Sequence, residues 1–455
     1  MSKAVEIIKL ALTALLLVSL VCLSVFYMNL YGSVKTYDFT AENDKAVRNR
    51  FYKSSYVGLM DEGFVSPYFV GICVDGAKTG YLGTRVDTIY ASLKNSVSEF
   101  LSASAQVAVS SAEEFASCAD GDFIYIRYRC ELPRSVIYYM QNSDKILDDV
   151  DDEYIYDMFI LPYERGTYAV ARDKRGNYYR YTSSGAPAIN KNMMTSYTYF
   201  EEAFPFSFTR DMMSDGAFAD FGYGEKLDEY EILTSGGFYA ASAVVDVEDI
   251  LQKERVPEML TALGINPERA TSHESEDGVT YFDEGENVFT DRYGRLLYTA
   301  FSAQSGIPLS DIIGYAASDD GYSLTDLVGA ALVLGNSLGA FDGGAFSYAV
   351  TAVEPSAAGI VIEISHIYDG ISVDFDGDRA LKIKVEDGHV TYVFCKYADA
   401  TPYDGQSTVE NAPWLLRAAV AESEGKFGLT YIQKMQNGRL HLVLAAVTSG
   451  EASDE

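Results

Sequence analysis

The stretch Leu381–Tyr397 (LKIKVEDGHVTYVFCKY) contains residue types that could do nucleophilic chemistry, with His389 as a candidate base and Cys395 as a candidate thiol. A cysteine nucleophile needs its base within hydrogen-bond reach. The apolar alternation around both residues predicts a strand on each side of a tight Asp387-Gly388 turn. Spacing along one strand places His389 and Cys395 on the same face but about 20 Å apart. The sequence therefore predicts a hairpin here and not a Cys–His dyad.

Three further motifs have a chemical interpretation and a simpler structural one. Gly335–Gly339 (GNSLG) matches G-x-S-x-G, but a nucleophile elbow lies between a strand and a helix, whereas this motif ends an apolar helical run. Asp374–Asp378 (DFDGD) resembles part of a calcium loop, yet Val385 stands where that loop requires Glu. Asp148–Glu153 (DDVDDE) is an acidic run. We predict a helix C-terminus, a hairpin turn and a solvated loop, respectively.

Metal, nucleotide and sugar chemistry have no specific signal in the chain. The four histidines are His273, His366, His389 and His441, and none is close enough to another to form a helical metal-binding pair. There is no CxxC pair, no GxGxxG and no GxxxxGK[ST]. With 66 acidic residues, carboxylate pairs suited to glycoside hydrolysis are too numerous to be informative. We predict no catalytic, cofactor-binding or metal-binding residue and no cofactor.

The charge of the chain excludes one large class of partner. The net charge is −31, from 35 basic and 66 acidic residues. Such a surface repels phosphates, so we predict that the protein does not bind nucleic acid. The 35 Tyr and 24 Phe favour strands.

The N-terminal region predicts a membrane anchor. Leu10–Leu30 is apolar and uncharged, and as a helix it would span about 30 Å, one hydrocarbon core. Lys3 and Lys9 precede it, which places the N-terminus in the cytoplasm and the rest outside. The apolar run is long and ends in aromatic residues, which favours an uncleaved anchor over a signal peptide.

One face of this predicted span carries Thr13, Leu17, Leu20 and Ser24. It is a candidate helix-packing face in the membrane. The alternative, that these Ser and Thr residues have no packing role, stays open. Outside the span the cysteines are sparse, and a Cys118–Cys130 disulfide cannot be inferred from spacing alone.

The remaining elements predict an α+β fold of antiparallel sheets, each covered by helices. Residues 85–104 (RVDTIYASLKNSVSEFLSAS) place their apolar residues on one helical face. A helix is expected from Ile250 to Leu263, a second from Ser323 as N-cap, and a third after Pro413. Hairpins are expected at the Asp-Gly and Asn-Gly pairs. The predicted organisation is a cytoplasmic tail (1–9), a transmembrane helix (10–30), a linker with a first α+β domain (31–200), a middle α+β domain (201–312) and a C-terminal α+β domain (313–455).

Two segments carry a resemblance to a known family: DFIYIRYRCELPRSVIYYM (residues 122–140) and IYDGISVDFDGDRALKIKVEDGHVTYVFCKY (residues 367–397). Together with the single predicted span and the exterior remainder, they give the chain a resemblance to the YycH/YycI-type regulatory proteins of Gram-positive bacteria. It implies a single-pass cell-membrane protein with its bulk outside the cytoplasm. It also implies regulation, without catalysis, of a WalK-type sensor histidine kinase that controls cell-wall metabolism, together with a second related regulatory protein.

Two other functions remain open at this point. One is an exterior module that binds cell-wall polymer or peptide. The other is a cell-surface hydrolase.

Overall fold

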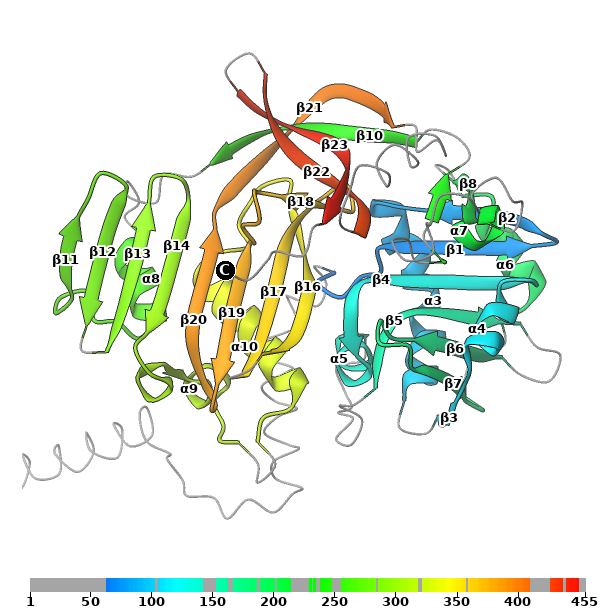
Figure 1. The fold of residues 1–455 in the computed structure, drawn as a ribbon, viewed down its shortest axis with the longest axis horizontal. Coiled ribbons are helices and arrows are strands. Elements are labelled where there is room, and N and C mark those ends of the chain that lie inside the picture. The colour runs from blue at the N-terminus through cyan, green and yellow to red at the C-terminus, as the bar shows by residue number, and fades with distance from the viewer. Residues whose placement is uncertain are drawn as a thin grey trace, which may run out of the picture. The chain divides into compact units, whose positions relative to one another are not determined.

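The structure is a computed structural model in which residues 63–449 are described, apart from internal gaps (Figure 1). The gaps are residues 103–104, 142–152, 163–166, 186–188, 201–202, 214–228, 231, 235–237, 248–254, 284, 318–320, 357–358, 410–425 and 437–438. The described part of the chain forms two large sheets, which differ in how their faces are covered.

The first sheet has nine described strands, in the order β3-β7-β6-β5-β4-β1-β2-β8-β9, and every pairing in it is antiparallel. Its strands are β1 (Phe69–Val74), β2 (Ala77–Tyr81), β3 (Gln106–Val109), β4 (Phe123–Pro133), β5 (Tyr154–Leu161), β6 (Tyr168–Arg172), β7 (Tyr178–Thr182), β8 (Phe204–Phe208) and β9 (Ile232–Thr234). The helices that accompany it are α3 (Thr84–Leu101), α4 (Ala112–Cys118), α5 (Arg134–Gln141), α6 (Lys191–Tyr197) and α7 (Thr209–Met213).

Both faces of this sheet are buried at its centre. All six residues of β1 are buried, and so are the first six of β4. One face holds an aromatic cluster in which Phe115, Phe159, Phe208 and Tyr230 meet with ring centroids 4.9–6.0 Å apart. A strand buried on both faces needs apolar residues at nearly every position, as β1 (FVGICV) shows.

The predicted helix near residue 90 is confirmed as α3. Its predicted inward residues are all buried: Val86, Ile89, Tyr90, Leu93, Val97, Phe100 and Leu101. Their spacing at three and four positions produces one continuous apolar stripe, which packs next to α5 and β1.

The second sheet has fourteen described strands. Twelve follow the order β11-β12-β13-β14-β20-β19-β17-β18-β22-β23-β10-β21, while β15 adds to β20 and β16 adds to β17. The strands are β10 (Phe238–Val247), β11 (Thr271–Glu274), β12 (Gly278–Asp283), β13 (Glu286–Asp291), β14 (Arg295–Ala300), β15 (Ile307–Pro308), β16 (Ser347–Ser356), β17 (Gly359–Tyr368), β18 (Ile371–Asp374), β19 (Leu381–Glu386), β20 (His389–Lys396), β21 (Ala398–Val409), β22 (Lys426–Gln436) and β23 (Arg439–Ser449). Only β18 and β22 pair in parallel among the described strands.

The second sheet is accompanied by the short 3-10 helix η4 (Ala303–Ser305), next to β20, and by three described α-helices. They are α8 (Val256–Ala262), α9 (Leu309–Ile313) and α10 (Leu324–Ser337). In Figure 1, α8 and α10 lie behind the strands β13 to β19. Gly335 of α10 packs directly against the Leu381 side chain of β19, since a Cβ added at Gly335 would lie 2.8 Å from it. The side of β19 to which Leu381 points is therefore the face covered by α10.

The predicted α+β fold, in which helices cover each antiparallel sheet, is wrong. Strands of two wide, mostly antiparallel sheets dominate the described residues, and the helices do not cover the two sheets in the same way. No helix among the described residues is long and apolar enough to cross a membrane. The predicted transmembrane segment 10–30, with its candidate packing residues Thr13, Leu17, Leu20 and Ser24, lies outside the described residues.

The predicted helices near the middle and the end of the chain have different outcomes. Helix α8 begins at Val256, with Pro257 in its first turn, whereas Ile250, the predicted start, lies outside the described residues. Proline suits a first turn because that turn does not use its N–H. The helix expected after Pro413 lies outside the described residues.

Candidate functional site

The Asp387-Gly388 hairpin forms as predicted, but the predicted orientation of His389 and Cys395 is wrong. Both lie in β20, where His389 pairs with Glu386 and Cys395 pairs with Leu381. The register shifts by one residue between these pairs, because Thr391 is an extra residue in β20. Such a β-bulge reverses the alternation of side chains beyond it. His389 and Cys395 therefore lie on opposite faces of the sheet, which removes any prospect of a dyad.

The environments of the two side chains agree with this. Cys395 is fully buried, and burial raises the pKa of its thiol to about 12, so the thiol stays protonated at neutral pH. The His389 Nδ1 lies 2.9 Å from the Asp387 carbonyl oxygen within the turn. The ring therefore contacts its own turn and not a reactive group.

The other sequence motifs are structural where they are described. Ser337 of the GNSLG motif is the last residue of α10, and Gly339 has a positive φ of 66° just after the C-cap. In the DFDGD motif, Asp376 and Gly377 both have positive φ, and the Gly377 N–H donates to the Asp374 carboxylate. The predicted helix C-terminus is thus confirmed. The turn at Asp376-Gly377 forms and is closed by a single bridge between Phe375 and Asp378, but the predicted hairpin is wrong, because β18 and β19 both pair with β17 and not with each other. Of the acidic run, residues 148–152 lie outside the described residues.

The four described cysteines are free thiols. Cys73, Cys118, Cys130 and Cys395 are all buried, and there is no Cys118–Cys130 disulfide. Burial raises the pKa of Cys118 and of Cys130 to about 12. No group of His, Cys, Asp and Glu that could hold a metal ion occurs within the described residues.

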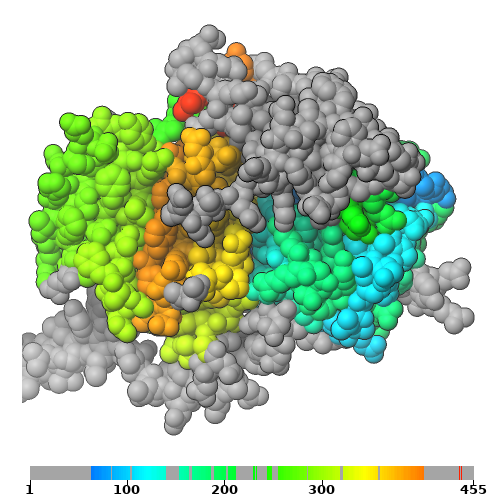
Figure 2. All heavy atoms as spheres, viewed as in Figure 1, coloured from blue at the N-terminus to red at the C-terminus, as the bar shows by residue number. Residues whose placement is uncertain are grey.

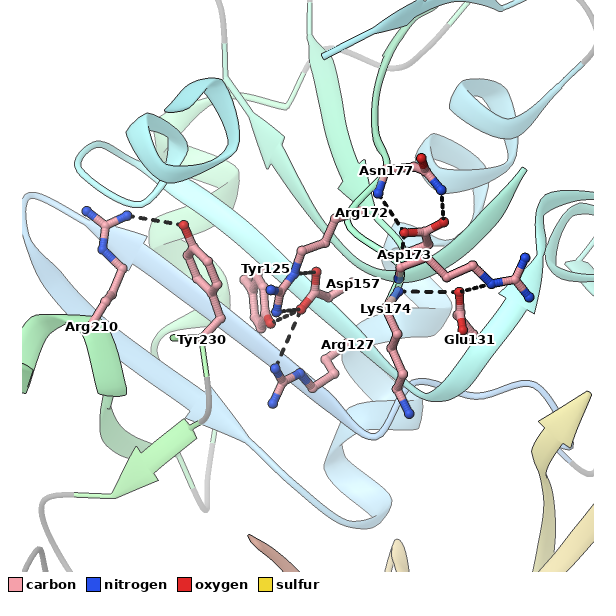
Figure 3. A network of polar contacts seen from close by, with 11 residues as sticks. Tyr125, Arg127, Glu131, Asp157, Arg172, Asp173, Lys174, Asn177, Arg210 and Tyr230 are labelled. Atoms are coloured by element: carbon pink, nitrogen blue, oxygen red, sulfur yellow. Dashed lines mark hydrogen bonds and ion pairs between the residues drawn. The ribbon is translucent and has the colours of Figure 1, made fainter. Parts of the chain in front are cut away.

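A buried charge network lies on the aromatic face of the first sheet. Asp157 is at its centre, fully buried, with Arg127 and Arg172 as its partners on the two neighbouring strands. Arg172 donates to both carboxylate oxygens at 2.7 and 2.8 Å, and the Tyr125 hydroxyl donates at 2.6 Å. Arg127 Nη2 lies 3.6 Å from the same carboxylate. Figure 3 shows these side chains converging on Asp157 from adjacent strands.

Aromatic rings enclose this network. The Arg172 guanidinium lies 4.6 Å from the Tyr230 ring centroid and 5.2 Å from that of Phe115. Arg210 reaches the Tyr230 hydroxyl from the far side. The Asp157 carboxylate is fully buried, and its oxygens already accept three hydrogen bonds. The network is therefore a means of holding β4, β5 and β6 in register.

The second sheet instead has a face that no described helix covers. We call it the open face, and it consists of the side chains of β12, β13, β14, β20, β19 and β17 that point away from Leu381. Cross-strand pairing places them in two rows. The first row is Thr280, Phe289, Leu297, Phe394, Lys382 and Glu363; the second row is Phe282, Asn287, Thr299, Tyr392, Lys384 and Val361.

Every one of these side chains retains some solvent exposure. Phe282 is exposed and the others are half-buried. Atoms of the strands β14, β20 and β19 are visible at the surface in Figure 2, on the side away from α10. A contiguous half-exposed row such as Phe289, Leu297 and Phe394 is the kind of apolar patch that marks interaction sites.

Positive charges gather next to this apolar row. Five cations (Arg295, Arg379, Lys382, Lys384 and Lys396) share three carboxylates (Glu363, Asp378 and Glu386). Four of the five cations are 32–45% exposed, whereas the carboxylates are only 17–23% exposed. The open face thus presents positive groups outward, although acidic residues outnumber basic ones almost two to one in the chain.

Neighbouring cations keep the Glu363 carboxylate of this face ionised. Burial acts to raise the pKa of Glu363, but hydrogen bonds and charge from Lys382 and Arg379 outweigh it and lower that pKa below its usual value. Glu363 accepts from Arg379 at 2.9 Å and lies 2.8 Å from Lys382. The carboxylate therefore stays charged beneath the two exposed cations and fixes their positions.

Sequence reasoning missed the open face. The alternation in LKIKVE and in HVTYVFCK was visible, and it predicted strands with one buried and one solvated face. What it did not reveal was that Phe394 would lie beside Leu297 and Phe289, because those residues are about a hundred positions earlier. No local sequence pattern predicts that three apolar residues from three different strands will lie side by side on a solvated face.

Comparisons with known proteins add no family assignment. No family model matches the chain, and the searches of curated proteins and of solved structures also gave no match.

Proposed function

We propose that this chain is an extracytoplasmic regulatory protein of the cell membrane, which modulates a two-component sensor histidine kinase through protein–protein contact. The observation that carries the proposal is the open face of the second sheet. Its combination of half-exposed aromatic residues and outward cations is suited to binding a surface and offers no catalytic group.

Two features support binding over chemistry. The titratable groups with the largest shifts, such as Cys130, Cys395 and His366, are buried and have no access to a substrate. The buried carboxylate Asp157 is fully engaged by its donors. The resemblance of residues 122–140 and 367–397 to YycH/YycI-type proteins gives the class of partner, a sensor kinase with cell-wall functions.

The mechanism would be a shift of the kinase between signalling states. A regulator changes such an equilibrium only if it binds one state more tightly than the other. An open sheet face can provide this difference, because a partner segment that is exposed in one kinase state can lie across the strands and be withdrawn in the other.

Site-specific photo-cross-linking in cells tests the proposal. A benzophenone residue in place of Tyr392, at the centre of the open face, should capture a sensor histidine kinase, and deletion of the protein should change that kinase's output. The matched control is the same group at Tyr199, which is 80% exposed and belongs to the region of the first sheet. Capture of wall polymer instead of a kinase, or equal kinase capture from both positions, would contradict the proposal.

A further inference from the structure

We propose that the open face binds an extended acidic segment of the partner protein that carries aromatic or aliphatic side chains, with Lys382 and Lys384 as the residues that determine specificity. This inference rests on the proposed function for the existence of a protein partner. It goes further in naming the chemistry of the segment and the residues that select it.

The two rows of the open face define the shape of the ligand. Phe289, Leu297, Phe394 and Lys382 lie on four neighbouring strands, so the row from Phe289 to Lys382 spans about 14 Å at the usual strand spacing. About five residues of extended chain cover that distance. Because successive side chains of an extended chain point to opposite sides, only every second residue faces the sheet, so a segment lying across the strands would present apolar side chains from its first and third residues and a carboxylate from its fifth.

The exposed lysines of the open face determine the sign of the charge that its ligand should carry. The exposed amines of Lys382 and Lys384 follow the apolar residues Phe394 and Tyr392 on the neighbouring strand. Their carboxylate partners, Glu363 and Glu386, are less exposed than the amines. An approaching segment therefore meets positive charge first, and an acidic segment is attracted where a basic one is repelled.

A second copy of this chain fits less well. Its net charge of −31 would repel an identical copy over the whole surface, whereas a short acidic segment brings only local charge. An anionic polymer would be attracted to the lysines but would leave Phe289, Leu297 and Phe394 without an apolar contact. The apolar row and the neighbouring lysines together favour a peptide that carries both apolar and acidic side chains.

Binding of defined probes to the full chain tests the inference. The first probe is a labelled peptide of about ten residues in which the unit Phe-Ser-Phe-Ser-Asp is repeated, so that the Phe and Asp side chains of each unit lie on the same side of the extended chain. The second replaces Asp with Lys, the third replaces Phe with Ser, and the fourth is inorganic polyphosphate. Fluorescence anisotropy should show that the first probe binds at least about tenfold more tightly than each of the others.

Charge-reversal variants locate the site. Lys382→Glu with Lys384→Glu should weaken the first probe about tenfold, since each reversal replaces an attraction by a repulsion. The control, Arg175→Glu with Lys191→Glu, makes the same change of charge at two exposed residues of the first sheet region and should leave binding unchanged. Circular dichroism verifies that both variants are folded.

Several results would overturn the inference. They are no binding of the first probe, equal weakening by both double variants, or polyphosphate binding as tight as that of the first probe. If the benzophenone at Tyr392 still captures the kinase in the Lys382→Glu/Lys384→Glu variant, the proposed function stands and this inference fails. If the probes behave as expected but no kinase is ever captured, the proposed function alone fails.

Discussion

The two sheets treat charge in opposite ways. In the first sheet, Asp157 and its arginine partners are buried among aromatic rings, whereas in the second sheet the ion pairs of Glu363 lie on a solvated face. Because the first group is buried, breaking its ion pairs strongly destabilises the fold, and an outside molecule cannot reach it. Because the second group is partly exposed, altering its ion pairs changes stability little, and a partner can reach it. Ion pairs between the same kinds of side chain therefore serve stability in one sheet and recognition in the other.

The largest expected effect is in the buried network. Asp157→Asn should destabilise the fold by about 3–5 kcal/mol, because it leaves the buried Arg127 and the half-buried Arg172 charged without a carboxylate. Denaturant unfolding measures the loss. The variant in which Arg127, Asp157 and Arg172 are all replaced by Met, Leu and Met should recover most of it. A loss below about 1 kcal/mol for Asp157→Asn would show that the two sheets do not differ in this way.

The next effect depends on pH and arises from His366, buried in the second sheet against Phe346, Tyr348 and Phe375. Burial, together with the charge of Lys396, lowers the pKa of His366 to about 3. Below the ordinary pKa of about 6.5 the unfolded chain binds a proton at this residue and the folded chain does not. Stability should therefore fall by roughly 1.4 kcal/mol for each pH unit below 6.5, until the folded pKa is reached.

The variant His366→Phe isolates this contribution, since phenylalanine fits an aromatic surrounding and cannot titrate. Its unfolding free energy should decline less steeply than that of the wild type between pH 6 and pH 4. Identical slopes for the two proteins would refute the assignment. The result shows whether the covered side of the second sheet is as intolerant of charge as the interior of the first.

A smaller effect is expected on the open face. Glu363→Gln should cost about 1 kcal/mol or less, and the cost should shrink as salt is added, because partly exposed pairs are screened. The lowered pKa of Glu363 means that its stabilisation is complete above the ordinary carboxyl pKa and is lost as pH falls through the folded value. Chemical unfolding at low and high salt checks this. A loss as large as that of Asp157→Asn would remove the contrast between the sheets.

The smallest expected effect concerns the thiols, which the two sheets treat alike. Cys73, Cys118, Cys130 and Cys395 are free and buried, so a thiol reagent at pH 8 should not modify them in the folded protein. Adding a reductant should leave the unfolding midpoint unchanged. Mass spectrometry of the alkylated protein before and after denaturation provides the measurement. A change of midpoint with reductant would indicate a disulfide that the structure does not contain.

Local structure was predictable where the chemistry is local. The Ser323–Asp326 capping box, the amphipathic stripe of α3 and the Asp387-Gly388 turn all follow from residues within a few positions of each other. The error at His389 and Cys395 has a defined cause, which is that Thr391 adds one residue to β20 and no sequence pattern marks it.

The sequence by itself determined that this chain is rich in antiparallel hairpins, strongly acidic and without a local catalytic or metal-binding motif. Only the tertiary structure decided which strands would be neighbours. Strand β14 pairs with β20 across nearly a hundred residues, and the backbone groups that form the hydrogen bonds are the same in every strand, so they do not specify which strands pair. That pairing buries one face against α10 and leaves Phe289, Leu297 and Phe394 beside Lys382 on the other. The physical reason is that burial is a property of the whole assembled sheet, whereas a sequence displays only what each strand could bury.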